Sequence, residues 1–256
     1  MRTRLAARVW ERTRAEASAT SDVLAACVAA EILHTATLCH DDLVDRSPRR
    51  RHHPSVWADL GVGVAVLLGD LLLAEAVTVI EESAPARTRR FLGVMKEMGL
   101  SELGAEMAPR GAPLGREAWI AHNRAKTGAL FSFVASACGE GDAPLCRALE
   151  EAGYGIGTGY QVLDDVVDVA GDESRTGKPR GVDQARGFLT PAQEDPEGCV
   201  ELALSHWNSA CASLSAWPSA REALEDYLVL DVLPLFRDVL AGSPLEGRLT
   251  SISARA

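Results

Sequence analysis

Residues 39–53 read CHDDLVDRSPRRRHH and place three aspartates shortly before three consecutive arginines. A second stretch, LDDVVD at residues 163–168, repeats the DDxxD spacing without neighbouring arginines. Leu43 and Val44 fill the positions between the aspartates in the first copy, and Val166 and Val167 fill them in the second, so each stretch can belong to an amphipathic helix. We call these two stretches the first and second acidic boxes, with aspartates Asp41, Asp42 and Asp45, and Asp164, Asp165 and Asp168.

Carboxylates four residues apart lie on one face of a helix and repel each other. Both boxes also lie shortly before a helix break, at Pro48 and at Gly171, where the negative end of the helix dipole disfavours further negative charge. A bound cation would offset both costs. Ligands that are all oxygen, with phosphate completing the coordination, are typical of Mg²⁺. Two solvated acidic helix ends remain the alternative, whereas a calcium-binding EF-hand loop does not fit because its central glycine pattern is missing.

The composition predicts an all-α fold in a single domain covering residues 1–256. The chain is 47% hydrophobic but only 5% aromatic, and alanine and leucine, both strong helix formers, dominate the apolar residues. Apolar periodicity predicts helices over 21–45, 57–82 (with a bend near Gly61), 87–107, 115–138, 143–170, 198–216 and 218–240. A long polar stretch between residues 171 and 197 predicts a functional loop.

The net charge of −10 argues against nucleic acid as a partner, because nucleic-acid binding requires a basic face. The six cysteines are scattered without a CxxC pair and are expected to be small buried hydrophobic residues. The N-terminus carries no apolar signal segment, and we see no run of about 18 apolar residues that would span a membrane. These features predict a soluble, cytoplasmic protein.

Five sequence blocks together resemble the trans-isoprenyl diphosphate synthases, or polyprenyl synthetases. The blocks are EILHTATLCHDDLVDRSPRRRHHPSVW at 31–57, LLGDLLLAEA at 67–76, AKTGALF at 125–131, GYQVLDDVVD at 159–168 and GKPRGVDQARGFLTP at 177–191. This resemblance implies an all-α bundle around a central cavity, with the two acidic boxes facing each other across its mouth. It further implies a Mg²⁺-dependent prenyltransferase that condenses an allylic diphosphate with isopentenyl diphosphate, and a homodimer.

The resemblance also implies a role for individual residues. All six aspartates of the boxes would hold Mg²⁺. Lys126, Thr127 and Gln161 would lie at the reacting groups. Diphosphate would be bound by Arg50, Arg51, His34, Lys178 and Arg4. On this interpretation the arginines and aspartates of residues 39–53 each bind phosphate, the aspartates through metal, and do not neutralise one another.

The chain departs from the family pattern at three places. Only 40 residues precede Asp41, so Arg2 and Arg4 are expected to be the remnant of an earlier basic motif whose lysine would fall at Met1. His52 stands where the family has glycine, and Phe188 stands where it has lysine. These departures affect the side expected to bind isopentenyl diphosphate, so a terpene-cyclase-like enzyme, another acceptor, or a partner subunit of a heteromeric synthase stay open as alternatives.

Product length in this family depends on side-chain size just before the first box. Ala36 and Thr37 are both small. We therefore expect a cavity that admits products of geranylgeranyl length or longer.

Overall fold

The computed structural model describes residues 1–13, 20–50, 52–139, 141–172, 175, 181 and 186–249. Arg51 and Lys178, both expected to bind diphosphate, lie outside the described residues.

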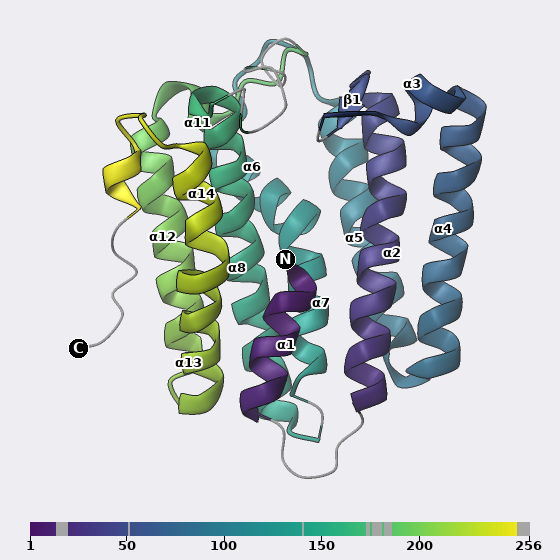
Figure 1. The fold of residues 1–256 in the computed structure, drawn as a ribbon, viewed down its shortest axis with the longest axis vertical. Coiled ribbons are helices and arrows are strands. Elements are labelled where there is room, and N and C mark those ends of the chain that lie inside the picture. The colour runs from purple at the N-terminus through teal and green to yellow at the C-terminus, as the bar shows by residue number, and fades with distance from the viewer. Residues whose placement is uncertain are drawn as a thin grey trace.

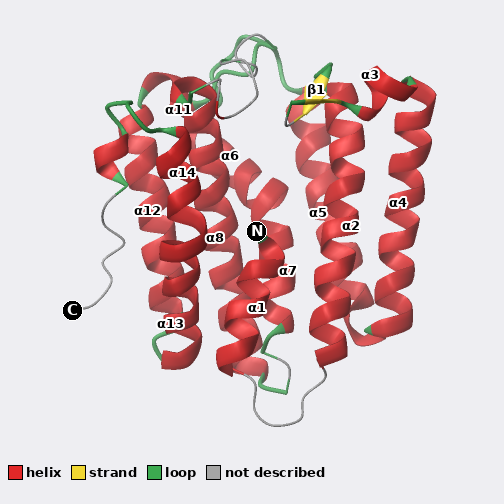
Figure 2. Ribbon diagram, in the orientation of Figure 1, coloured by secondary structure: helices red, strands yellow, loops and turns green. Residues whose placement is uncertain are grey.

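The described part of the chain is a bundle of roughly parallel and antiparallel helices, which confirms the predicted all-α fold (Figures 1 and 2). The longer elements are α1 (Arg2–Thr13), α2 (Thr20–Val44), α4 (Val62–Ser83), α5 (Thr88–Met107), α7 (Ala129–Ala137), α8 (Ala143–Ala170), α12 (Pro196–Ser213) and α13 (Pro218–Tyr227). Shorter helices are α3 (Val56–Leu60), α6 (Arg116–Asn123), α11 (Pro191–Glu194), α14 (Leu233–Val239), and the 3₁₀ turns η1 (Pro85–Arg87) and η4 (Glu246–Arg248). The strands β1 (Arg49–Arg50) and β2 (His53–Pro54) form a small antiparallel hairpin directly after the first acidic box.

Three predicted helices are interrupted where the sequence suggested continuity or a mere bend. Residues 57–82 divide into α3 and α4 at Gly61, whose φ of +91° suits glycine. Residues 115–138 contain a π-helical segment, η2 (Arg124–Gly128), and residues 218–240 contain another, η3 (Leu228–Val232). Such π segments often occur at functional sites, and η2 carries Lys126 and Thr127.

Glycines on α8 determine how closely the site elements approach one another. A Cβ atom added at Gly153 would lie 2.5 Å from the Cα of Ser132, and one at Gly157 would lie 2.6 Å from the Cα of Gly128. On the opposite side, a Cβ at Gly159 would lie 2.5 Å from the indole nitrogen of Trp207 in α12. Glycine is therefore needed at these positions for α8 to pack between η2–α7 and α12.

The sequence was expected to contain no apolar run that suggests a membrane span, and the structure has two helices that bear on this expectation only weakly. Residues Ser21–Val44 and Val62–Ser83 are each long and apolar enough to cross a membrane, judged by length and composition alone. The first window is half buried within the bundle, as in the core helix of many proteins, but only 22% of the second window, in α4, is buried. Figure 1 shows α4 at one edge of the bundle, and the exposed residues of this helix include Leu67 and Leu71.

Candidate active site

The carboxyl-terminal end of α2 carries the first acidic box, and the following hairpin folds back onto it. Asp42 is buried, with only 4% of its surface exposed. Arg50, on β1, donates hydrogen bonds to both carboxylate oxygens of Asp42, at 2.7–3.0 Å. The expectation that the aspartates and arginines of this stretch do not neutralise one another is therefore wrong for this pair, because a carboxylate buried this deeply requires a close counter-charge.

The turn that connects β1 and β2 contains His52, which stands where the family pattern has glycine. His52 has φ of +69°, in the left-handed region that glycine adopts without strain. The backbone at this position keeps the conformation that the family's glycine would favour, although the side chain has changed.

Asp41 lies on the inner side of α2 and interacts electrostatically with Lys126 of η2. Burial raises the pKa of Asp41 to about 6, against the opposing effect of the Lys126 charge. The Nζ atom of Lys126 lies 3.0 Å from a carboxylate oxygen of Glu102 on α5. Burial alone would lower the pKa of Lys126, but the charges of Glu102 and Asp41 outweigh it and the net pKa is raised, so the lysine is a permanent cation.

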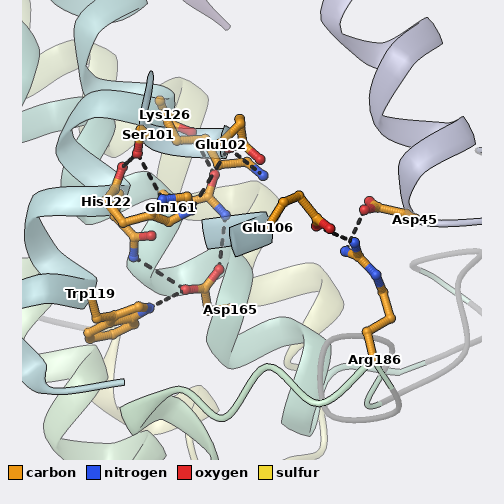
Figure 3. A network of polar contacts seen from close by, with 12 residues as sticks. Asp45, Ser101, Glu102, Glu106, Trp119, His122, Lys126, Gln161, Asp165 and Arg186 are labelled. Carbon is orange, nitrogen blue, oxygen red and sulfur yellow. Dashed lines mark hydrogen bonds and ion pairs between the residues drawn. The ribbon is translucent and has the colours of Figure 1, made fainter. Parts of the chain in front are cut away.

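Asp45 forms an ion pair with Arg186, which lies in the C-terminal half of the polar stretch between residues 171 and 197. One guanidinium nitrogen of Arg186 contacts the carboxylate of Asp45, and another lies 2.7 Å from a carboxylate oxygen of Glu106 on α5. Figure 3 shows Arg186 between these two carboxylates, with Asp45 coming from α2. Arg186 thus connects two helices at the end of the bundle that carries the first acidic box.

The first two aspartates of the second acidic box differ in their exposure to solvent. Asp164 is exposed, whereas Asp165 is buried. Asp165 accepts hydrogen bonds from the indole N–H of Trp119 at 2.6 Å, from the amide of Asn123 at 3.2 Å and from the amide of Gln161 at 2.9 Å (Figure 3). These donors occupy most of the lone-pair positions of Asp165, which leaves Asp164 better placed to bind a metal ion.

The π-helical segment η2 carries side chains that interact with both boxes. The hydroxyl of Thr127 donates to the side-chain oxygen of Gln161 at 2.6 Å, and the amide of Gln161 donates to Asp165. Lys126, the neighbour of Thr127, interacts with Asp41 of the first box. The three residues expected at the reacting groups are therefore brought together, between the aspartates of both boxes.

The structure brings the remaining predicted site residues less close to these contacts. Asp168 is partly buried, and its backbone oxygen accepts a hydrogen bond from the backbone N–H of Gly181 at 2.9 Å. His34 is partly buried on α2, seven residues before Asp41 and so on a similar face of the helix. The side chain of Arg4 is 65% exposed and lies 3.4 Å from Asp231 in η3, so Arg4 pairs with a carboxylate outside both boxes.

The residues present fit a hard divalent cation that phosphate helps to bind. Among the described residues, no group of three or more His, Cys, Asp or Glu side chains is arranged to hold a metal ion by itself. Mg²⁺ usually takes only one or two protein carboxylates and completes its coordination with water and phosphate oxygens. Asp41, whose raised pKa shows that nearby cations do not fully compensate its charge, together with Asp45 and the exposed Asp164, offers such carboxylates.

The comparison with known proteins agrees with this geometry. The sequence model of the family described as "Polyprenyl synthetase" matches residues 1–192. The chain belongs to the polyprenyl synthetase family.

Two curated relatives illustrate the similarity. The chain is 31% identical over 227 residues to a geranylgeranyl diphosphate synthase of Mycobacterium tuberculosis, covering 86% of this chain and 63% of the relative. It is 33% identical over 184 residues to a short chain isoprenyl diphosphate synthase of Methanocaldococcus jannaschii, covering 66% of this chain and 54% of the relative. The matched segment of this polyprenyl synthetase thus spans between half and two thirds of these relatives' length.

Solved structures share the fold. A polyprenyl synthase from Caulobacter crescentus, complexed with calcium and isoprenyl diphosphate, superposes with a TM-score of 0.75 at 24% identity, covering 88% of this chain and 81% of that one. A geranyltransferase from Helicobacter pylori, complexed with magnesium and isoprenyl diphosphate, gives a TM-score of 0.72 at 24% identity, covering 88% and 82%.

Several site residues of this polyprenyl synthetase were not predicted from the sequence. They are Glu102, Glu106, Trp119, Asn123 and Arg186. The two glutamates and the Trp–Asn pair are each spaced by four residues, which places each pair on one helix face. That spacing was available as a signal, whereas nothing local distinguishes Arg186 from the other arginines of its loop.

Proposed function

We propose that the protein is a Mg²⁺-dependent prenyltransferase that condenses an allylic diphosphate with isopentenyl diphosphate to give a longer polyprenyl diphosphate. The observation that carries this proposal is the placement of Lys126, which interacts electrostatically with Asp41, next to Thr127, whose hydrogen bond to Gln161 continues to Asp165 of the second acidic box. It links two sets of carboxylates by way of a permanent cation and two polar side chains. The curated relatives that carry isoprenyl or geranylgeranyl diphosphate synthase names support the same reaction class.

The metal ligands in this proposal come from both boxes. Asp41, Asp45 and Asp164 would hold Mg²⁺, which when bound stabilises the negative charge that develops on a departing diphosphate. Asp42 and Asp165 would act mainly by orientation, because Arg50 and the Trp119 indole already bind them. The Helicobacter pylori structure of the same fold is complexed with magnesium and isoprenyl diphosphate, which supports a divalent cation in this proposal.

The remaining residues would act on the substrates. Lys126 remains protonated and supplies a fixed positive charge for the diphosphate as its C–O bond to the allylic carbon breaks. The pyrophosphate leaves with the electron pair of that bond. The double bond of isopentenyl diphosphate attacks the resulting allylic cation, and loss of a proton restores a double bond in the product.

Thr127 and Gln161 have fixed orientations in this scheme. Their mutual hydrogen bond and the bond from Gln161 to Asp165 hold the polar atoms in place before substrate binds. Groups that do not need to reorganise during the reaction stabilise developing charge most effectively. Arg51 and Lys178 complete the proposed diphosphate-binding set on the strength of the family resemblance, as does His34. Arg4, which pairs with Asp231, is not included.

We further propose that the protein is a homodimer and that α4 forms the interface. The outer face of α4 and the residues just before it expose large apolar side chains, namely Leu60, Val62, Val64, Val66, Leu67 and Leu71. Leu67 and Leu71 are 70% and 64% exposed and lie four residues apart on one helix face. Several exposed large apolar side chains on one helix at the edge of the bundle are typical of protein–protein or membrane contact.

A reducing compartment such as the cytoplasm is consistent with the cysteines. All six are free, and burial raises the pKa of Cys27 and of Cys199 to about 11. Thiols with such raised pKa values are poorly reactive and behave as small buried hydrophobic groups.

The test of the proposed reaction is incubation with Mg²⁺, isopentenyl diphosphate and each allylic diphosphate in turn, followed by product analysis. An elongated diphosphate supports the proposal. A hydrocarbon or alcohol formed without isopentenyl diphosphate would instead indicate a cyclase-like enzyme, and activity that appears only with a second protein would indicate a partner subunit.

A further inference from the structure

The guanidinium of Arg186 directly contacts Asp45, an aspartate of the first acidic box that we expect to bind metal. Both side chains remain partly exposed. The Arg186 side chain is 20% exposed and contacts Asp45, which is 31% exposed, and Glu106. Asp42, by contrast, is saturated by Arg50 deep beneath the surface. The Asp45–Arg186 pair therefore lies at the accessible side of the box, where a metal ion and a diphosphate would arrive.

The backbone around Arg186 is firmly positioned. The backbone N–H of Gly111 donates to the carbonyl of Gly187 at 2.9 Å, and that of Leu114 donates to the carbonyl of Leu189 at 2.9 Å. The side-chain amide of Gln193 donates to the carbonyl of Phe188 at 3.0 Å. These bonds fix the segment against the loop that follows α5, so the guanidinium of Arg186 can change partners without movement of its backbone.

Phe188 provides a surface on which the guanidinium can pivot. The guanidinium carbon of Arg186 lies 4.7 Å from the centre of the Phe188 ring, and that of Arg110 lies 3.9 Å from the same ring. A cation over an aromatic face is attracted to the ring without the directional constraint of a hydrogen bond. Arg186 can therefore rotate between acceptors while it remains stacked.

A metal ion on Asp45 and the guanidinium of Arg186 compete for the same carboxylate oxygens. A carboxylate that ligates Mg²⁺ gives up electron density to the ion, and two cations on one carboxylate repel each other. A diphosphate bound to that metal would offer the displaced guanidinium a bidentate phosphate partner, the geometry that arginine prefers.

We propose that Arg186 occupies the metal-binding side of Asp45 as a temporary counter-ion, and that it transfers to the diphosphate when metal and diphosphate bind. This inference rests on the proposed function, since it takes the first acidic box as a metal site. It adds a diphosphate-binding cation at a position outside the basic residues that the family resemblance identifies. It also gives a role to Arg186 as the second cation, besides Arg110, that stacks on Phe188. Phe188 is the residue that stands where the family has lysine.

Two binding measurements test the proposal without any turnover. The first is titration of the full-length protein with Mn²⁺ alone, followed by electron paramagnetic resonance. The Arg186→Gln variant should bind Mn²⁺ about fivefold more tightly than the wild type, the effect of removing one partly exposed ion pair that competes with the metal. The second is titration with inorganic pyrophosphate at saturating Mn²⁺, in which the same variant should bind at least roughly tenfold more weakly, the loss expected for a charge-assisted phosphate contact.

Arg110→Gln is the matched control. Arg110 stacks on the same ring and binds the same Glu106, at 2.5 Å, whereas Arg186 also contacts Asp45 of the first acidic box. Its replacement should leave both affinities within about twofold of the wild type. Arg186→Lys, which keeps the charge but loses the planar fork, should restore part of the pyrophosphate affinity. Circular dichroism shows whether each variant keeps its helices.

The proposal requires both changes. If Arg186→Gln binds Mn²⁺ no more tightly than Arg110→Gln, or binds pyrophosphate as tightly as the wild type does, Arg186 is a structural bridge between α2 and α5 and the proposal is wrong. Absence of prenyl transfer by the wild-type protein would refute the proposed function but leave the binding result as it stands, so the two failures can be distinguished.

Discussion

Asp41 should cost the folded protein stability whenever no metal is bound. Its pKa is raised from the ordinary 3.8 to about 6, chiefly by burial, and this value already includes the attraction of Lys126. A pKa difference of about two corresponds to ~3 kcal/mol of folding free energy at neutral pH. Structural relaxation reduces this destabilisation to about 2–3 kcal/mol. The uncharged variant Asp41→Asn should therefore be more stable than the wild type at pH 7 by about 2–3 kcal/mol.

The sign of the pH dependence follows from proton binding. Between pH 3.8 and 6 the unfolded chain has released the Asp41 proton while the folded chain still holds it. Folded protein thus binds more protons in this window, and its stability falls as the pH rises through it. The advantage of Asp41→Asn should accordingly be nearly absent at pH 4, grow between pH 4 and 6, and be constant above about pH 7.

Urea denaturation followed by circular dichroism, at pH 4, 5, 6 and 7 without metal, measures this advantage directly. A parallel series with Mg²⁺ and pyrophosphate should stabilise the wild type and stabilise Asp41→Asn much less, because a ligand that binds only the folded state stabilises it in proportion to its occupancy. Equal stability of the two proteins at pH 7, or an advantage that does not change with pH, would refute the reasoning that Asp41 is a buried carboxylate kept for metal binding.

Three further predictions follow from particular side chains. Ala36 is fully buried five residues before Asp41, and Thr37 is partly buried four residues before it; Ala36→Phe or Thr37→Phe should shorten the product, as chromatography of the prenyl chains will show, and an unchanged distribution would contradict this. If the proposed homodimer forms through α4, replacing Leu67 and Leu71 together by aspartate should give a monomer in light scattering, while detergent-dependent solubility of the wild type would point to membrane contact instead. His52→Gly should raise the free energy of unfolding by about 1 kcal/mol by relieving a left-handed backbone, and a loss of stability would show that the imidazole is needed.

The helices were largely predictable because their apolar periodicity is local. Residues 21–45 and 143–170 were expected to be helical, and the structure has α2 at Thr20–Val44 and α8 at Ala143–Ala170. The π segments were not predictable, since they depend on how η2 fits against the glycine face of α8. Helix type at such a point is set by tertiary packing and not by intrinsic propensity.

The site was predictable as a set of residues but not as a set of contacts. The aspartates of the boxes, Lys126, Thr127 and Gln161 follow from motifs with fixed spacing. The motifs do not reveal which aspartates of each box are available to metal, because this depends on burial. Asp42 accepts hydrogen bonds from Arg50, and Asp165 accepts one from Trp119. Both partners are far from obvious in a linear sequence, since each comes from an element that reaches the box only after folding.

The central claim is that metal held by the two acidic boxes drives prenyl transfer. The measurement that tests it most directly is product formation from isopentenyl diphosphate and an allylic diphosphate, with and without Mg²⁺, for the wild type and for Asp41→Ala and Asp164→Ala. We predict an elongated diphosphate from the wild type with Mg²⁺, none after chelation, and loss of turnover in both variants while their helical circular dichroism is unchanged. Near-wild-type turnover in both variants would contradict the account.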